Sequence, residues 1–251
     1  MNDKNRKVDV VITEKIHLSH GSGAGLHALL EEIIIPCLLP GDSGAREDAF
    51  IVDQVNGRLA FTTDSFVVDP LEFPGGNIGK LAACGTINDL AMMAAQPTHL
   101  AVSLIIEEGL EISSLQKYLR SLRSVCDECG VTICCGDTKV VDRGKADGLF
   151  ITTSGIGVVA GNISMSAANA RHGDSVIVSG PAGLHGTAIL AQRKNLGFAS
   201  QAISDCAPLN EPARALISAV PGTRVMRDAT RGGIAAVLNE IAADSGVTIR
   251  L

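Results

Sequence analysis

Hydrophobic positions repeat at helical spacing in three segments of the first half of the chain. The spacing predicts helices over 25–37 and over the stretch that Gly130 ends. Between these two segments, the pattern of residues 77–95 predicts a third helix that is apolar on nearly all sides. Only Asn88 and Asp89 interrupt its apolar run, and an unpaired buried charge costs several kcal/mol. The carboxylate therefore needs a partner, either another polar side chain or a bound cation.

Runs rich in β-branched residues predict strands between these helices. The pair Asn56-Gly57 separates two such runs, 49–55 and 58–68, and predicts a β-hairpin. Further strands are predicted over 99–106, 131–135 and 148–161. The order β-β-α-β-α-β-β is typical of an α+β layer, in which helices cover one face of a mixed sheet.

A stretch of small residues near 160–170 separates this unit from a second one, so that the predicted domains are 1–160 and 170–251. In the second unit, strands are predicted over 174–180, 223–228 and 247–251, and helices over 183–194, 210–220 and 231–246. Because the last strand is cut off at Leu251, we expect the second domain to be incomplete. The predicted fold class is therefore α+β, a two-layer N-terminal mixed sheet with helices on one face plus an incomplete second α/β domain.

Composition narrows the classes of function. The 251 residues are 46% hydrophobic and 19% charged, which is enough to bury a core. A net charge of −6 and an aromatic content of 3% disfavour a nucleic acid partner. The longest apolar stretch, 26–40, contains two glutamates and is too short to span a membrane. The chain begins with no signal-peptide pattern, and its seven cysteines predict reduced thiols in the cytoplasm.

Four of these cysteines, Cys126, Cys129, Cys134 and Cys135, are close together in the sequence and raise the question of a zinc or redox site. Cys126 falls on the apolar stripe of the predicted helix, and the last two lie in a short β-rich run. Cysteine acts as a small hydrophobic residue in such places. The second pair also lacks the CxxC spacing of zinc ligands, so we favour a structural interpretation.

Five aspartates stand out because they interrupt or end apolar elements: Asp48, Asp64, Asp89, Asp137 and Asp228. Carboxylates at the ends of neighbouring strands converge, and such oxygen ligands suit Mg²⁺ held together with substrate phosphates. Simpler interpretations also exist. Asp228 precedes a helix and could cap it, and Asp137 could form an Asx turn.

Two glycine-containing segments fit a phosphate. The loop 20–25 leads into a helix with free backbone N–H groups, and 229–233 opens another helix with Arg231 at its positive end. Gly85 and Thr86, one turn before the helix carboxylate, leave room for a ligand to approach. The sequence contains neither a Walker A motif nor a Rossmann fingerprint, which excludes the common nucleotide-binding folds.

In three of these segments, 62–95, 136–157 and 227–242, the sequence resembles the HypE family of hydrogenase maturation factors. This family lies in the superfamily of aminoimidazole ribonucleotide synthetase, selenophosphate synthetase and thiamine-phosphate kinase. The resemblance covers nearly the whole chain and implies a homodimer formed through the N-terminal sheets, with ATP and Mg²⁺ near the interface. It implies Asp48, Asp64, Asp89 and Asp137 as metal ligands, Lys139 as the catalytic residue, and further nucleotide contacts from Gly21, Gly23, Gly25, Asn88, Thr138, Asp228 and Arg231.

The resemblance also implies a reaction, the ATP-dependent dehydration of a carbamoyl group on a C-terminal cysteine. The product is an S-cyanate for the cyanide ligands of NiFe-hydrogenase, and the implied partners are the carbamoyltransferase HypF and the HypC–HypD scaffold. The last cysteine here is Cys206, so we expect the carrier tail to be missing from this chain. The alternatives are a sister enzyme of the small-molecule kinase or selenophosphate synthetase type, and a non-catalytic dimeric nucleotide-binding fragment.

Overall fold

The computed structural model describes residues 14–41, 49–53, 55–159, 161–193 and 201–251. Its centre is a four-stranded mixed sheet in the order β1-β6-β4-β5. β6 is antiparallel to both of its neighbours, and β4 is parallel to β5. The strands are β1 Arg58–Phe66, β4 Ala95–Glu107, β5 Thr132–Val141 and β6 Leu149–Val159, and a small hairpin of β2 Glu72–Phe73 and β3 Gly76–Asn77 precedes the first long helix.

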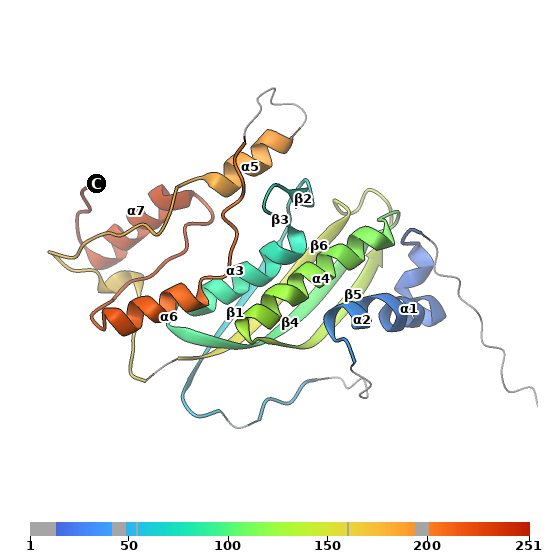
Figure 1. The fold of residues 1–251 in the computed structure, drawn as a ribbon, viewed down its shortest axis with the longest axis horizontal. Helices are drawn as coiled ribbons and strands as arrows, with labels where there is room; N and C mark the ends of the chain where they lie inside the picture. Colours follow the sequence, from blue (N-terminus) through green and yellow to red (C-terminus); the bar gives the residue numbers. More distant parts are fainter. Residues whose placement is uncertain (1–13, 42–48, 54, 160, 194–200) are drawn as a thin grey trace, which may run out of the picture.

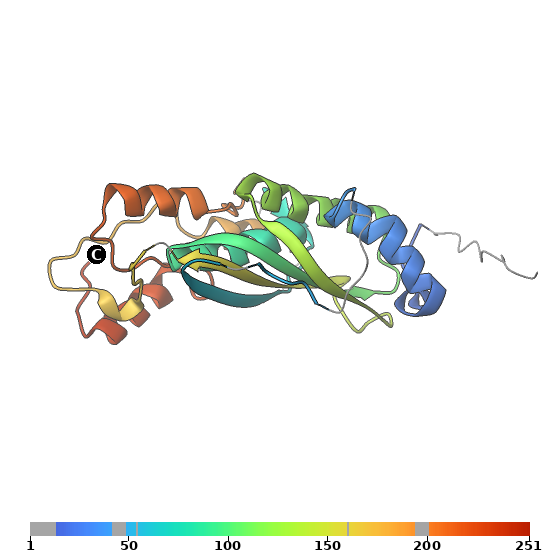
Figure 2. The same ribbon diagram turned by 90° about the horizontal axis from the view of Figure 1, so that it is seen from below.

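Helices α3 (Ile78–Met92) and α4 (Ile112–Cys129) cover one face of the sheet, as Figure 1 and the view from below in Figure 2 show. The apolar stripe predicted for α4 is buried, and Gly130 ends the helix in the left-handed conformation with φ of 67°. The opposite face of the sheet carries no helix in the described part of the chain. The prediction of a mixed sheet with helices on one face is confirmed.

The approach of α3 to the sheet corrects one expectation. A side chain at Gly85 would place its first carbon 2.7 Å from the Phe66 ring of β1, so the helix packs directly on the strand. Thr86 is fully buried, and its hydroxyl lies 2.6 Å from that of Thr153 on β6. The room left by these small residues is therefore filled by the sheet and is not open to a ligand.

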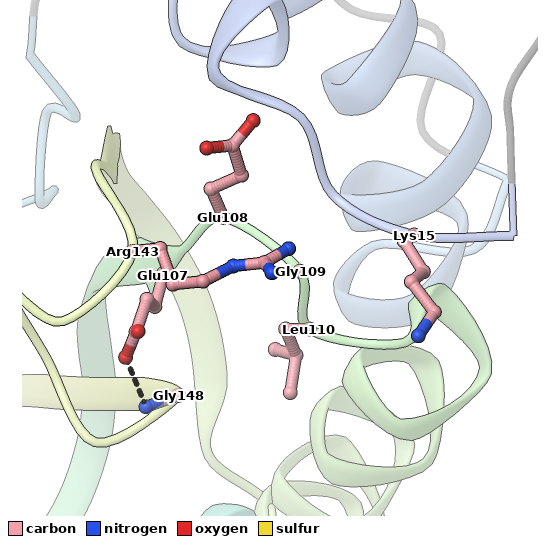
Figure 3. Close-up of a pocket in the computed structure, with 7 residues that line it drawn as sticks. All are labelled: Lys15, Glu107, Glu108, Gly109, Leu110, Arg143 and Gly148. Carbon is pink, nitrogen blue, oxygen red and sulfur yellow. Dashed lines mark hydrogen bonds between the residues drawn. The ribbon is translucent and has the colours of Figure 1, made fainter.

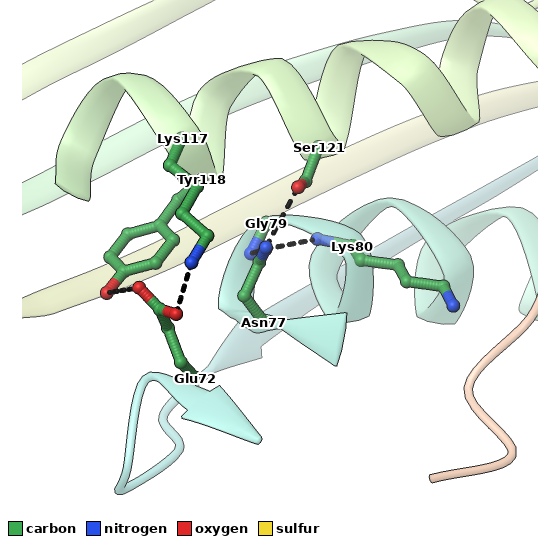
Figure 4. A network of polar contacts seen from close by, with 7 residues as sticks. All are labelled: Glu72, Asn77, Gly79, Lys80, Lys117, Tyr118 and Ser121. Atoms are coloured by element: carbon green, nitrogen blue, oxygen red, sulfur yellow. Dashed lines mark hydrogen bonds and ion pairs between the residues drawn. The ribbon is translucent and has the colours of Figure 1, made fainter. Parts of the chain in front are cut away.

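The first turn of α3 is capped and tied to α4 by polar contacts (Figure 4). The Asn77 side-chain oxygen accepts hydrogen bonds from the backbone N–H groups of Gly79 (3.0 Å) and Lys80 (3.1 Å). Its amide donates to the Ser121 hydroxyl of α4 at 2.8 Å. In the adjoining hairpin, Glu72 accepts a hydrogen bond from the Tyr118 hydroxyl of α4 at 3.1 Å. The hairpin and the helix start are thus held at defined positions over the sheet.

The N-terminal helix predicted over 25–37 is confirmed as a continuous helical segment. It runs through α1 (Gly23–Leu29), a π-helical turn (Leu30–Ile34) and α2 (Ile35–Leu38), after the short 3₁₀ turn η1 (Leu18–Gly21).

The predicted hairpin at Asn56-Gly57 is wrong in its first half. None of the described residues in 49–57 lies in a strand, and the Ile51 side chain is 84% exposed. A type I′ hairpin turn requires positive φ at both central residues, whereas here only Gly57 has one, of 128°. The segment before β1 therefore does not pair with β1 within this chain.

The three predicted helices of the second unit are confirmed as α5 (Leu184–Gln192), α6 (Asn210–Ala219) and α7 (Gly233–Ser245). The three predicted strands are wrong, because residues 161–193 and 201–251 contain none. Ile177, at the centre of the most apolar of them, is 82% exposed. A β-rich run becomes a strand only where another backbone pairs with it, and these runs have no such neighbour among the described residues.

Helix α6 joins this unit to the first one, because Ala213 packs against Ala91 and Met92 near the end of α3. Among the described residues, no helix is long and apolar enough to cross a membrane.

Candidate functional site

The register of the sheet decides which of the predicted site residues share a face. Asp64 of β1 pairs with Thr153, which pairs with Val102, whereas Asp137 of β5 pairs with Ser103. Paired residues point to the same side of a sheet and successive residues to opposite sides. Asp64 therefore lies on the helix-covered face and Asp137 on the open face. β1 and β5 are also the two outer strands, three strand spacings or about 14 Å apart.

On the helix-covered face, Asp64, Asp89 and Asp228 form what we call the acidic cluster. Asp64 and Asp89 share a side-chain hydrogen bond, and Asp228 lies within electrostatic reach of both. The Thr62 hydroxyl of β1 donates to an Asp89 carboxylate oxygen at 2.9 Å. Arg231, at the start of the turn before α7, is close enough to oppose the negative charge. The carboxylate that interrupts α3 is thus partnered by β1 and by the turn before α7.

The acidic cluster holds more negative charge than its surroundings compensate. Burial, followed by the charge of Asp89 and the hydrogen bond with it, raises the pKa of Asp64 to about 6. Burial and the charge of Asp89 also raise the pKa of Asp228. A cation that neutralises these carboxylates would stabilise the folded protein, so their chemistry fits a divalent metal ion.

We expect Asp64→Asn to stabilise the cation-free protein at about pH 8 and to have little effect at about pH 4. The folded state holds the Asp64 proton up to a pKa of about 6, against an ordinary 3.8. Between these values the folded chain binds the extra proton, so the free energy of unfolding falls as the pH rises. With allowance for solvent screening, the substitution should raise the free energy of unfolding by about 1–2 kcal/mol at high pH.

Denaturant titrations of both proteins at the two pH values measure this difference. An equal gain at both pH values would contradict the ionisation argument, since it would show a packing effect. The same titrations of Glu128→Gln, an exposed carboxylate on α4, provide the control.

Asn88 has a different role from the one the resemblance implies. Its side-chain oxygen accepts a hydrogen bond from the Leu209 backbone N–H at 2.7 Å, and its amide donates to the Ala207 carbonyl at 3.1 Å. The side chain is buried and holds the segment that leads into α6. Asn88 is therefore a structural clamp in this structure and does not point at its neighbour Asp89.

On the open face, Asp137 and Lys139 form an ion pair on β5. The Lys139 ammonium donates to both carboxylate oxygens, at 2.6 and 2.7 Å, and together with the Thr138 N–H it holds the pKa of Asp137 below its ordinary value. Asp137 lies inside a strand, so the Asx-turn interpretation is wrong. The Thr138 side chain is buried on the opposite, helix-covered face, away from this pair.

The glycine loop packs on the same outer strand. A side chain at Gly21 would contact Val140 of β5, at 3.2 Å between the two β-carbons, and one at Gly25 would collide with the Ser19 carbonyl at 2.1 Å. Gly23 has φ of 53° and no neighbour within 4 Å. Gly25 is therefore required by packing, and at Gly21 a larger residue would force Val140 to shift. The loop lies against β5, the outer strand on the other side of the sheet from β1, which carries Asp64.

The predicted residues thus fall into two groups on the two outer strands. The structure brings together Asp64, Asp89, Asp228 and Arg231, but it does not bring Asp137 to them within one chain. Asp48 lies outside the described residues. Within the described ranges, no group of three or more His, Cys, Asp or Glu side chains is arranged to hold a metal ion. Thr62 was missed from the sequence, although its position two residues before Asp64 on a strand places it on the same face.

A hollow of about 360 Å³ at the end of the sheet contains none of the predicted residues (Figure 3). Its lining includes Lys15, Arg143 and Glu107. Glu107 accepts hydrogen bonds from the backbone N–H groups of Gly144 and Gly148, and these bonds lower its pKa. This carboxylate closes the turn between β5 and β6, so we interpret the hollow as a consequence of that turn.

Comparison with known proteins gives matches over both units. Residues 46–159 match the family "AIR synthase related protein, N-terminal domain", and residues 171–251 match "AIR synthase related protein, C-terminal domain". The chain is 45% identical to carbamoyl dehydratase HypE of Rhodobacter capsulatus over 236 residues. The aligned region covers 93% of this chain and 69% of that protein.

Two solved structures are similar. The crystal structure of hydrogenase maturation protein HypE in complex with ATP superposes with a TM-score of 0.80 and 43% identity, over 91% of this chain and 68% of that one. The HypE chain of a HypE–HypF complex superposes with a TM-score of 0.72 and 48% identity, over 75% of this chain and 62% of the matched chain.

Proposed function

The chain belongs to the HypE family of carbamoyl dehydratases, which act in hydrogenase maturation, and on this premise we propose that it uses Mg²⁺ and ATP to dehydrate a carbamoyl group carried on a C-terminal cysteine thiol. The product is an S-cyanate that supplies the cyanide ligands of NiFe-hydrogenase. The observation that carries this proposal is the acidic cluster, whose raised pKa values match a site that is completed by a cation.

Asp64 and Asp89 are the described residues best placed to hold Mg²⁺, and Asp48 and Asp137 complete the proposed ligand set. Asp228, the member of the cluster that the second unit supplies, and Arg231 both lie near Asp64, as expected for groups near the phosphates. A relative with 43% identity is known in complex with ATP, which supports ATP as the nucleotide. Mg²⁺ would neutralise charge on the transferred phosphoryl group.

The site is completed by a second copy of the chain. Within one chain Asp137 and Lys139 lie on the open face of the sheet, where Leu59 and Phe61 of β1 are 56% and 69% exposed. Leu59 and Phe61 line a hollow of about 380 Å³ together with further apolar side chains, including Met93. An exposed apolar sheet face of this kind marks an interaction surface. Dimerisation through it would place Asp137 and Lys139 of each chain at the interface with its partner.

The ion pair on β5 indicates how Lys139 acts. The two carboxylate oxygens of Asp137 hold the Lys139 ammonium in place on the open face, where it is suited to stabilise negative charge on a phosphate or amide oxygen. ATP supplies the phosphoryl group that turns the amide oxygen into a good leaving group. The dehydration then moves the oxygen of the carbamoyl group to phosphate and leaves a carbon–nitrogen triple bond.

The partners follow from the same premise. A relative at 48% identity forms a complex with HypF, so we propose that HypF also binds this chain and supplies the carbamoyl group. The HypC–HypD scaffold is the proposed acceptor of the cyanide, and the proposed compartment is the cytoplasm. The two proposed domains are 1–160, with the nucleotide site and the dimer face, and 170–251.

The experiment that tests the function offers the protein a peptide that ends in S-carbamoylcysteine, together with Mg²⁺ and ATP. We expect the peptide to lose the mass of one water molecule while one phosphate is released for each peptide converted. The non-hydrolysable ATP analogue with an imido bridge is the control, and it must give no loss. A peptide that gains a phosphate group and keeps it would instead identify a kinase of the sister type.

A further inference from the structure

Two free cysteines meet where the segment before α6 lies on α3. Cys84, one turn before Asn88 in the middle of α3, is 2% exposed, and Cys206 is partly buried against the same core. Each thiol is near enough to the other to shift its pKa. Asn88, one turn after Cys84, is hydrogen-bonded to the segment directly after Cys206. Neither residue belongs to the proposed site, so this pair needs an explanation of its own.

Hydrogen bonds on both sides fix the position of Cys206 over the helix. On the C-terminal side, Asn88 binds the backbone of Ala207 and Leu209. On the N-terminal side, the Cys206 N–H donates to the Ser204 hydroxyl at 3.1 Å. The Ser204 N–H in turn donates to the Pro74 carbonyl in the β2–β3 turn at 2.8 Å. The two thiols are therefore held together by the fold.

The surroundings lower the pKa of the Cys206 thiol. The hydrogen bond with Cys84, supported by the positive charge of Lys80, lowers the pKa of Cys206 in spite of its burial. The same hydrogen bond and burial raise the pKa of Cys84, so Cys84 keeps its proton. Lys80 lies one turn before Cys84 on the same helix. A thiol with a lowered pKa beside a second thiol and a cation is typical of cysteines that react with oxidants.

We propose that Cys84 and Cys206 form a reversible disulfide, a redox modification site that cross-links α3 to the segment leading into α6. The oxidant is a hydroperoxide. Cys206 loses its proton to solvent and its thiolate attacks the peroxide, so that the oxygen–oxygen bond breaks and a sulfenic acid forms. The departing hydroxide takes up a proton from solvent and leaves as the first water. Cys84 then attacks this sulfur and gives up its proton, so that the sulfur–sulfur bond forms and the second water leaves. Two thiols lose two electrons, and one hydrogen peroxide becomes two waters.

Other cysteines also lie close together, and Cys129 is near enough to raise the pKa values of both Cys84 and Cys126. Cys134 and Cys135 are neighbours in β5 with their sulfur atoms 3.8 Å apart. Cys129 donates its thiol to the Asn210 side chain at 3.4 Å and is buried. A useful experiment must therefore identify the residues that pair and not only count the thiols that disappear.

The experiment treats the full chain with hydrogen peroxide, blocks remaining thiols by alkylation, and digests the protein with trypsin without reductant. We expect one cross-linked product of the peptides 81–117 and 195–214, each of which contains a single cysteine. Its mass is the sum of the two peptides less two hydrogens, and dithiothreitol separates them. The oxidised protein should also unfold at a temperature about 5 °C higher, because the cross-link restricts the unfolded chain.

Cys206→Ser should abolish both the cross-linked product and the shift in unfolding temperature, and Cys134→Ser should leave both unchanged. These substitutions need no change at the fully buried Cys84, so folding is preserved for the comparison. Recovery of Cys206 as an alkylated thiol, or as a sulfinic acid without a cross-link to Cys84, would overturn the proposal. This result would leave the proposed dehydratase activity untouched, because no nucleotide takes part in the test.

Discussion

Asp89→Asn is expected to weaken the binding of Mg²⁺–ATP more than tenfold, which corresponds to over about 1.4 kcal/mol of binding free energy. Asp89 is the central member of the acidic cluster, hydrogen-bonded to Thr62 and to Asp64. An amide keeps the size of the side chain and can still accept the bond from Thr62. It cannot supply the negative charge that a divalent ion requires.

Isothermal titration of ATP in the presence of Mg²⁺ measures the effect, and Glu128→Gln serves as the matched control. Glu128 is an exposed carboxylate on α4, so its loss changes the net charge equally without touching the acidic cluster. If Asp89→Asn binds Mg²⁺–ATP as tightly as the control, the acidic cluster is not the metal site, and the proposed function loses its main support.

Combining an Asp89→Asn chain and an Asp137→Asn chain in one dimer is expected to restore a tight ATP site that neither variant has alone. If each site combines the acidic cluster of one chain with Asp137 of its partner, then Asp89→Asn and Asp137→Asn each destroy both sites of their own homodimer. In a mixed dimer, one site carries both substitutions and the other carries neither. Random assortment of equal amounts makes half of the dimers mixed, so about one quarter of the wild-type number of tight ATP sites should return.

The two variants are co-expressed with different affinity tags, and dimers that carry both tags are isolated before the number of bound ATP molecules is measured. The isolated mixed dimers should bind one ATP where the wild type binds two. Each variant expressed alone with both tags provides the control. Mixed dimers without any tight site would show that the two groups of residues do not meet across an interface. The observation behind this prediction is that Asp137 lies on the other face and the other outer strand of the sheet from Asp64, so the two groups do not meet within one chain.

Local patterns were sufficient for most of the N-terminal unit. The apolar stripe that ends at Gly130 predicted α4, and the apolar run after Asn77 predicted α3 within a few residues. Both depend on side chains a few positions apart, which the sequence displays directly. The same reasoning was wrong for Asn56-Gly57 and for the run around Ile177, because a strand exists only where a distant backbone pairs with it.

In the candidate site, too, some features follow from the local sequence and others from the tertiary structure. The sequence by itself determined that Asp64, Asp89, Asp137 and Asp228 interrupt or end apolar runs, since each residue's neighbours along the chain can be seen directly. It did not determine which of these carboxylates are buried, because the Asp137 side chain is 59% exposed. Only the tertiary structure decided who those partners are: Asp64 meets Asp89 and Asp228 on one face, while Asp137 meets Lys139 on the other. It also assigned Asn88 to the backbone of Leu209, far along the chain. The physical reason is that the pairing of distant strands sets the face of every side chain, and a shift of one residue in that pairing would exchange the two faces.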